Sequence, residues 1–111
     1  MTAFHLTTDQ ADAGRVVTVH GELDIETVPE LDASLEAVRE AGMDCMVDLA
    51  ACTFIDSSGT RAIAAAAERF EADGLRLTLH CPPANRAVRF VIDLVGLTDV
   101  VTVTPDDATA S

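Results

Sequence analysis

Residues 47–63 read VDLAACTFIDSSGTRAI, and this stretch joins a predicted strand to a predicted helix. The strand is the short, mostly apolar run CMVDL at residues 45–49. We expect a loop over residues 52–56 and then a helix that begins near Ser57 or Ser58. Its apolar residues recur at helical spacing until Gly74 ends it. A buried strand followed by an amphipathic helix is typical of an α/β domain.

The residues upstream predict a hairpin and a first helix. Residues 15–24 (RVVTVHGELD) alternate between apolar and polar side chains, as a half-buried strand does, and residues 4–8 fit a weaker strand. The turn signal Asp12-Ala13-Gly14 between them predicts that the two strands are antiparallel. Thr27 with Glu30 forms a capping-box signature, so we expect a helix from there to Gly42.

The residues downstream complete the element order. Residues 75–80 alternate as a strand, Asn85 is expected to cap a third helix that Gly96 closes, and residues 100–103 favour a last strand. The predicted fold is one α/β domain with a mixed, mostly parallel sheet of four to five strands and an N-terminal antiparallel hairpin. Amphipathic helices should cover mainly one face of this sheet. The core should span residues 4–103, and residues 104–111 should form a polar tail.

Composition excludes several classes of function. The 111 residues carry a net charge of −12, which repels phosphate backbones and anionic lipid heads, so we expect neither nucleic acid nor a membrane as a partner. Three cysteines without a CxxC pair are typical of reduced thiols, which predicts a cytoplasmic protein with structural cysteines. His5 and His20 are distant from the cysteines in sequence, and His80, although it adjoins Cys81, does not form the spaced ligand pairs that a zinc site needs, so no metal site is expected.

The segment Asp56-Ser57-Ser58-Gly59 is the best candidate for chemistry. One interpretation is helix capping, because an acid or a serine at a helix start satisfies free amide groups. A second is phosphorylation, since a helix N-terminus tolerates negative charge. A third is a serine hydrolase, but Ile55 stands where the first glycine of the Gly-x-Ser-x-Gly motif belongs. We therefore predict no enzymatic activity of its own.

Two motifs together carry a family resemblance. Gly21-Glu22-Leu23-Asp24, followed about thirty residues later by Phe54-Ile55-Asp56-Ser57-Ser58-Gly59, resembles the STAS domain of bacterial anti-sigma factor antagonists over residues 4–103. The resemblance implies that the unphosphorylated protein binds an anti-sigma factor, which is a serine kinase that itself holds ATP and Mg²⁺, and so frees the sigma factor. Phosphorylation of a serine in the motif would break the complex, and a phosphatase would restore it.

The resemblance also implies roles for individual residues. The acceptor would be Ser58, with Ser57 as the fallback. The residues expected to shape the site and face the partner are Asp24, Asp56, Ser57, Gly59, Thr60 and Arg61. The pair Thr60-Arg61 departs from many relatives, which have an aliphatic residue after the glycine, and this affects the choice of partner. A STAS subunit of a transporter ATPase or of a stress-signalling complex, in which the serine is never modified, is the alternative with the same fold.

Overall fold

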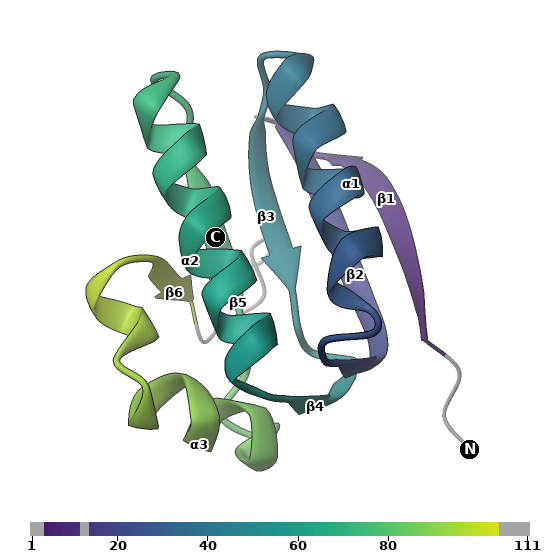
Figure 1. The fold of residues 1–111 in the computed structure, drawn as a ribbon, viewed down its shortest axis with the longest axis vertical. Helices are drawn as coiled ribbons and strands as arrows, with labels where there is room; N and C mark the ends of the chain where they lie inside the picture. The colour runs from purple at the N-terminus through teal and green to yellow at the C-terminus, as the bar shows by residue number, and fades with distance from the viewer. Residues whose placement is uncertain (1–3, 12–13, 105–111) are drawn as a thin grey trace.

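The computed structural model describes residues 4–11 and 14–104. Its helices cover one face of a mixed sheet, as predicted (Figure 1). The sheet has the order β1-β2-β3-β5-β6, and β4 pairs with β2 away from this path. In chain order the elements are β1 (His5–Ala11), β2 (Gly14–Leu23), α1 (Val28–Glu40), β3 (Asp44–Asp48), β4 (Cys52–Ile55), α2 (Ser57–Ala72), β5 (Leu77–His80), α3 (Arg86–Leu94), the 3-10 helix η1 (Leu97–Asp99) and β6 (Thr102–Thr104).

The strand directions agree with the sequence analysis. β1 and β2 are antiparallel, in a register that runs from His5 opposite His20 to Ala11 opposite Gly14. The β2–β3, β3–β5 and β5–β6 pairs are all parallel. Of the turn predicted at 12–14, residues 12 and 13 lie outside the described residues, but the hairpin that the turn was expected to produce is confirmed.

One strand was missed. Residues 52–55, predicted to be a loop, form β4, which pairs in parallel with the end of β2, so the sheet has six strands instead of four or five. β2 pairs with β3 over Gly14 to Thr18 and with β4 over Gly21 to Leu23, and the second pairing has a register shift between Gly21, whose φ is 95°, and Glu22. Gly21, Glu22 and Leu23 lie within β2, as the predicted strand over residues 15–24 implies. A four-residue strand shows too little alternation to be recognised, and the end of β2 supplies its pairing.

The predicted helix faces pack against the sheet. The buried side of α1 carries Leu31, Leu35 and Val38. The buried side of α2 includes Ile63 and Phe70, and both contribute to one core together with apolar residues of β2, β3 and β5. On α3, Val88 and Ile92 are buried, whereas Val95, just past the helix end, is 48% exposed.

Two of the predicted helix caps are wrong. The Thr27 side chain does not cap α1; its hydroxyl donates to the Glu22 carbonyl oxygen at 2.9 Å and accepts from the Asp24 amide at 2.9 Å. Asn85 does not cap α3 either. Its amide nitrogen donates to the carbonyl oxygens of Leu49 at 2.9 Å and Cys52 at 2.8 Å. Both side chains instead hold loops at the C-terminal ends of strands, a role that depends on tertiary contacts.

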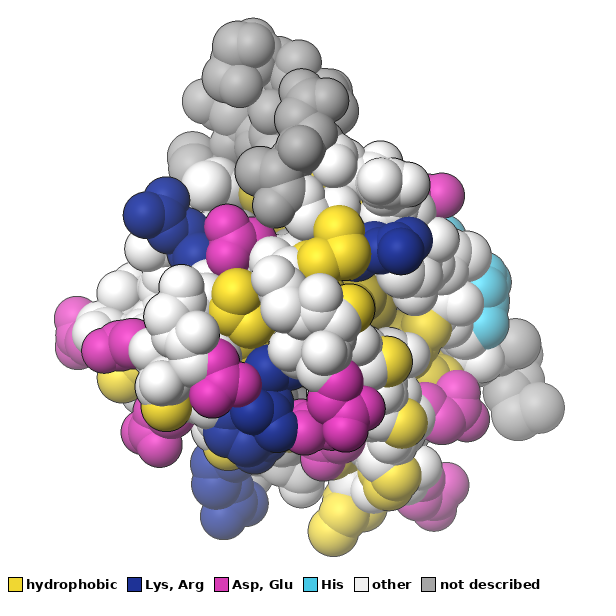
Figure 2. Space-filling model, turned by 90° about the horizontal axis from the view of Figure 1, so that it is seen from above, with side chains coloured by type: hydrophobic (Ala, Val, Ile, Leu, Met, Phe, Trp, Pro, Cys, Tyr) yellow, Lys and Arg dark blue, Asp and Glu magenta, His cyan; other side chains and the backbone are white. Residues whose placement is uncertain are grey.

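Ion pairs join the C-terminal part of α1 to that of α2. The Arg39 guanidinium pairs with Glu36 on its own helix and with Asp73 at the end of α2, and Arg69 approaches Glu36 at 3.7 Å. The hydrogen bond from Arg39 lowers the pKa of Glu36. Arginines and acidic side chains alternate over this end of the molecule (Figure 2). The net negative charge is therefore partly balanced here, far from the start of α2.

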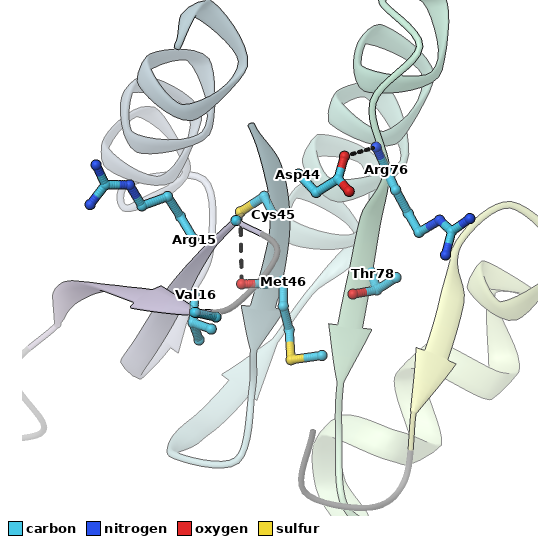
Figure 3. A pocket seen from close by; sticks show the side chains of 9 residues that line it. Arg15, Val16, Asp44, Cys45, Met46, Arg76 and Thr78 are labelled. Carbon is cyan, nitrogen blue, oxygen red and sulfur yellow. Dashed lines mark hydrogen bonds between the residues drawn. The ribbon is translucent and has the colours of Figure 1, made fainter. Parts of the chain in front are cut away.

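The sheet face without helices bears Val16, Met46 and Thr78, whose side chains lie on one side of the strands (Figure 3). They line a hollow of about 280 Å³ near the N-terminal ends of β3 and β5. There the Asp44 carboxylate accepts a hydrogen bond from the Arg76 amide at 2.9 Å. No helix in the described part of the chain is long and apolar enough to cross a membrane.

Candidate functional site

The ends of β2 and β4 lie side by side and bring two predicted site residues to one edge of the sheet. Leu23 and Ile55 are register partners in this parallel pair, and the Asp56 amide donates to the Leu23 carbonyl oxygen at 3.3 Å. Asp24 and Asp56 are the residues that follow these two strand ends. Helix α2 begins at the same edge, with Ser57 as its first residue. The fold thus places the two motifs next to each other.

Asp56 is the N-cap of α2. Its backbone is extended, with φ −113° and ψ −172°, and its Oδ1 accepts a hydrogen bond from the Gly59 amide at 3.0 Å. This is the capping interpretation of the sequence, and it satisfies one of the free amides at the helix start. The cap fixes where the two serines between Asp56 and Gly59 lie.

The two serines differ in exposure. Ser57 is exposed, whereas Ser58 is only partly exposed. Arg61, one turn further along α2, lies over Ser57: its Nη2 donates to Ser57 Oγ at 3.4 Å and its Nε donates to the Ser57 carbonyl oxygen at 3.3 Å. The structure therefore brings Ser57 and Arg61 together at the protein surface.

Gly59 and Thr60, also predicted to face a partner, are buried. A Cβ atom added at Gly59 would lie 2.8 Å from Ile55 Cγ1 and 3.0 Å from the Leu23 carbonyl oxygen. Glycine at this position therefore lets α2 approach the strands closely. Thr60 is 4% exposed, and its hydroxyl donates to the Ser57 carbonyl oxygen at 3.0 Å. Gly59 and the Thr60 side chain therefore position the helix start and are not part of the exposed surface.

Asp24 acts in the turn that connects β2 to α1. Its Oδ1 accepts hydrogen bonds from the amides of Glu26 at 3.0 Å and Thr27 at 3.2 Å. A carboxylate that bonds backbone amides two and three residues ahead is a common turn device. Asp24 thus shapes the loop beside the serines and is itself partly exposed.

Two apolar side chains at this edge were not among the predicted site residues. Ile25, directly after Asp24, is 72% exposed, and Phe54, two residues before Asp56, is 46% exposed. Large apolar side chains that gather in an exposed patch are typical of a protein contact. Their exposure carries no sequence signal, because Phe54 stands in a mostly apolar run and Ile25 in a turn. We call Ile25, Phe54, Asp56, Ser57 and Arg61 the switch surface.

The reactive group that the switch surface offers is the hydroxyl of Ser57. In the described part of the chain, no histidine hydrogen-bonds to either serine, and the side chain that contacts Ser57 Oγ is that of Arg61. His5 and His20 stack on each other across β1 and β2, with ring centroids 4.1 Å apart. Residues 4–11 and 14–104 hold no group of three or more metal-binding side chains.

The cysteines are buried, as structural thiols would be. Burial raises the pKa of the Cys45 thiol to about 12 and also raises the pKa values of Cys52 and Cys81. A thiol that stays protonated at neutral pH is a poor nucleophile and a poor metal ligand. The raised pKa values are consistent with a structural role for these thiols.

Comparison with known proteins identifies the domain. A sequence model of the family "Mlab, STAS domain" matches residues 6–103. The structure is similar to that of an anti-sigma factor antagonist from Mycobacterium paratuberculosis, with a TM-score of 0.80, 28% identity, and coverage of 97% of this chain and 91% of that one. It also shares its fold with SpoIIAA in its unphosphorylated form (TM-score 0.73, 23% identity, 97% and 92% coverage). The Bacillus cell fate determinant SpoIIAA in its phosphorylated form gives a TM-score of 0.67, 24% identity, and 97% and 96% coverage.

The family match covers residues 6–103, which includes both motifs and every strand and helix except the first residue of β1 and the last of β6. The element order and the parallel pairing of the strands after the hairpin agree with the fold shared with the Mycobacterium antagonist. The chain belongs to the STAS domain family.

Proposed function

We propose that this domain is an anti-sigma factor antagonist that switches partners through the phosphorylation state of its D-S-S-G segment. The observation that carries the proposal is the exposed Ser57 at the first position of α2, three residues after the exposed Phe54, in a fold shared with a Mycobacterium antagonist. The unphosphorylated switch surface would bind the anti-sigma factor. Apolar contact by Phe54 and Ile25 would supply affinity, and the serine would lie inside the contact.

The charge of the phosphate explains why phosphorylation would release the partner. A phosphate adds about −1.5 to −2 charge units next to the Asp56 carboxylate, and burying that charge against a partner is costly. A loss of about 3 kcal/mol of binding free energy weakens binding more than a hundredfold. In the modification step the serine oxygen bonds to the γ-phosphorus of ATP held by the partner kinase, ADP leaves, and the hydroxyl proton is released. A phosphatase would reverse the change by hydrolysis.

Access favours Ser57 over Ser58 as the acceptor. The resemblance in the sequence pointed to Ser58, with Ser57 as the fallback. Ser57 is the exposed member of the pair, and a kinase must reach the hydroxyl oxygen to transfer a phosphoryl group. We therefore assign the acceptor role to Ser57 within this proposal.

The test is to purify the tagged chain from its native host and to map its phosphorylated peptides together with the proteins that it retains. We expect one phosphate on Ser57 in part of the population, and a small serine kinase bound to the unphosphorylated form. Ser57→Ala should remove the phosphate and Ser58→Ala should not. A phosphate found on Ser58 instead would overturn the acceptor assignment and leave the switch itself in place.

A second candidate is a constitutive STAS subunit of a transporter ATPase, in which the serine is never modified. The family model that matches the chain is described as "Mlab, STAS domain" and not as an anti-sigma factor antagonist, which supports this second candidate. The same purification separates the two functions. A retained transporter ATPase with no phosphate on either serine supports the second candidate and contradicts the first.

A further inference from the structure

Ser57 and Arg61 form a surface pair whose geometry suits a phosphate. They stand four residues apart on α2, so their side chains lie on the same face one turn apart. In the unmodified protein Arg61 Nη2 already donates to Ser57 Oγ at 3.4 Å. Among the described residues Arg61 makes no salt bridge, whereas Arg39, Arg69 and Arg89 each pair with a carboxylate. The guanidinium is thus placed over the hydroxyl with no carboxylate to compete for it.

We propose that Arg61 binds the phosphate of phosphorylated Ser57 within the same chain; this inference rests on the proposed function of the switch surface. A guanidinium presents a planar fork of N–H donors that matches two phosphate oxygens, and such charge-assisted bonds are short and strong. An acid that precedes the base by four residues has the favourable order for a helix. Arg61 keeps its position by donating to the Ser57 carbonyl oxygen at 3.3 Å.

The pairing changes what the phosphate presents to other proteins. Arg61 cancels one unit of the phosphate charge and offsets its repulsion by the Asp56 carboxylate, so phosphorylated Ser57 carries less net charge than an isolated phosphoserine. The bound guanidinium also covers phosphate oxygens that a phosphatase must contact. Arg61 therefore stabilises the phosphorylated state and slows its removal.

The pair also distinguishes the two serines. The Arg61 contacts in the structure are to the oxygens of Ser57, and the Ser58 side chain has no hydrogen bond to Arg61 among the described contacts. A phosphate on Ser58 would be attached to a partly exposed side chain, three residues before Arg61. The inference thus predicts a stronger effect of Arg61 on a phosphate at Ser57 than on one at Ser58.

The test uses the full chain with phosphoserine encoded at position 57, so that no kinase is needed. The phosphorus NMR signal is followed against pH, with and without Arg61→Gln. The pairing favours the dianion, so we expect the second phosphate pKa to be about half a unit lower with arginine than with glutamine at position 61. Arg61→Lys, which keeps the charge and loses the fork, should fall between them. Phosphoserine encoded at position 58 should respond less to Arg61→Gln.

Arg69→Gln is the matched control, because Arg69 lies two turns further along α2 and approaches Glu36 instead. It should leave the phosphate pKa unchanged. A phosphatase time course on the same samples should show faster phosphate release from Arg61→Gln than from the parent. Equal phosphate pKa values and equal release rates with and without Arg61 would overturn the inference. If the host protein never carries phosphate, the proposed function fails even where this pKa difference is found.

Discussion

Alkaline pH should destabilise this protein through its buried thiols. All seven basic residues are arginines and the chain has no tyrosine, so cysteines are the side chains that titrate between about pH 9 and 11 in the unfolded chain. Burial raises the pKa of Cys45 from 9.0 to about 12. Above pH 9 the unfolded chain therefore binds fewer protons than the folded protein, and the free energy of unfolding falls as pH rises.

The magnitude follows from the two pKa values. Between pH 9 and 10 the Cys45 thiol ionises in the unfolded state and stays protonated in the folded one, which removes about 1 kcal/mol of stability. Below pH 9 this contribution is present in full, and the loss levels off near the folded pKa. Burial acts in the same direction on Cys52 and Cys81, so they add to the loss.

The assay is urea unfolding in reducing buffer at pH 8, 9 and 10, for the parent and for Cys45→Ala. The variant loses stability at every pH because it removes buried atoms. Its decrease between pH 9 and 10 should be smaller than that of the parent by about 1 kcal/mol. Equal decreases in the two proteins would refute the reasoning, since Cys45 would then not be the protonated, buried thiol described above.

Substitutions at three positions test how the switch surface and its neighbouring loops are held. Asp56→Ala should lower the free energy of unfolding by about 1 kcal/mol through loss of the helix cap, and Asp56→Asn, which keeps a capping oxygen, should lower it less; equal losses would contradict a cap. Gly59→Ala places a Cβ 2.8 Å from Ile55 Cγ1 and 3.0 Å from the Leu23 carbonyl oxygen, so thermal unfolding should show a lower Tm. A higher Tm would mean that helix propensity outweighs this crowding. Asn85→Ala leaves two carbonyl oxygens without their donor and should cost about 1–3 kcal/mol in urea unfolding. Asn85→Asp should cost more because a carboxylate would face both oxygens, and a smaller cost than alanine would contradict the hydrogen bonds described.

Periodicity predicted the elements that pack with long, regular faces. The apolar residues of α1 and α2 recur at helical spacing and are buried as expected. Gly42, Gly74 and Gly96 follow the helices with φ values of 73°, 74° and 72°, a conformation that glycine adopts without strain. These are local signals, so the sequence alone carries them.

Features that depend on distant contacts were not predictable in this way. The four residues of β4 form a strand because the end of β2 lies beside them. Thr27 and Asn85 have typical capping residue types, yet each side chain hydrogen-bonds to a neighbouring loop instead. Val95 fits the helical apolar pattern but lies past the end of α3.

The motif located the candidate site in the sequence, but it did not indicate which side chains are exposed there. The order Asp-Ser-Ser-Gly correctly placed a helix start, and Asp56 caps it. Residue type could not tell that Ser57 is more exposed than Ser58, or that Gly59 and Thr60 are buried. The direction of each side chain depends on how α2 packs on β2 and β4, which no local pattern encodes.

The central claim is that a phosphate on the switch surface controls partner binding. The most direct measurement is the affinity of the serine kinase retained from the host for the full chain with serine and with encoded phosphoserine at position 57, determined by titration calorimetry. The account predicts binding more than a hundredfold weaker with phosphoserine, as a loss of about 3 kcal/mol implies. Equal affinity for the two forms would contradict it.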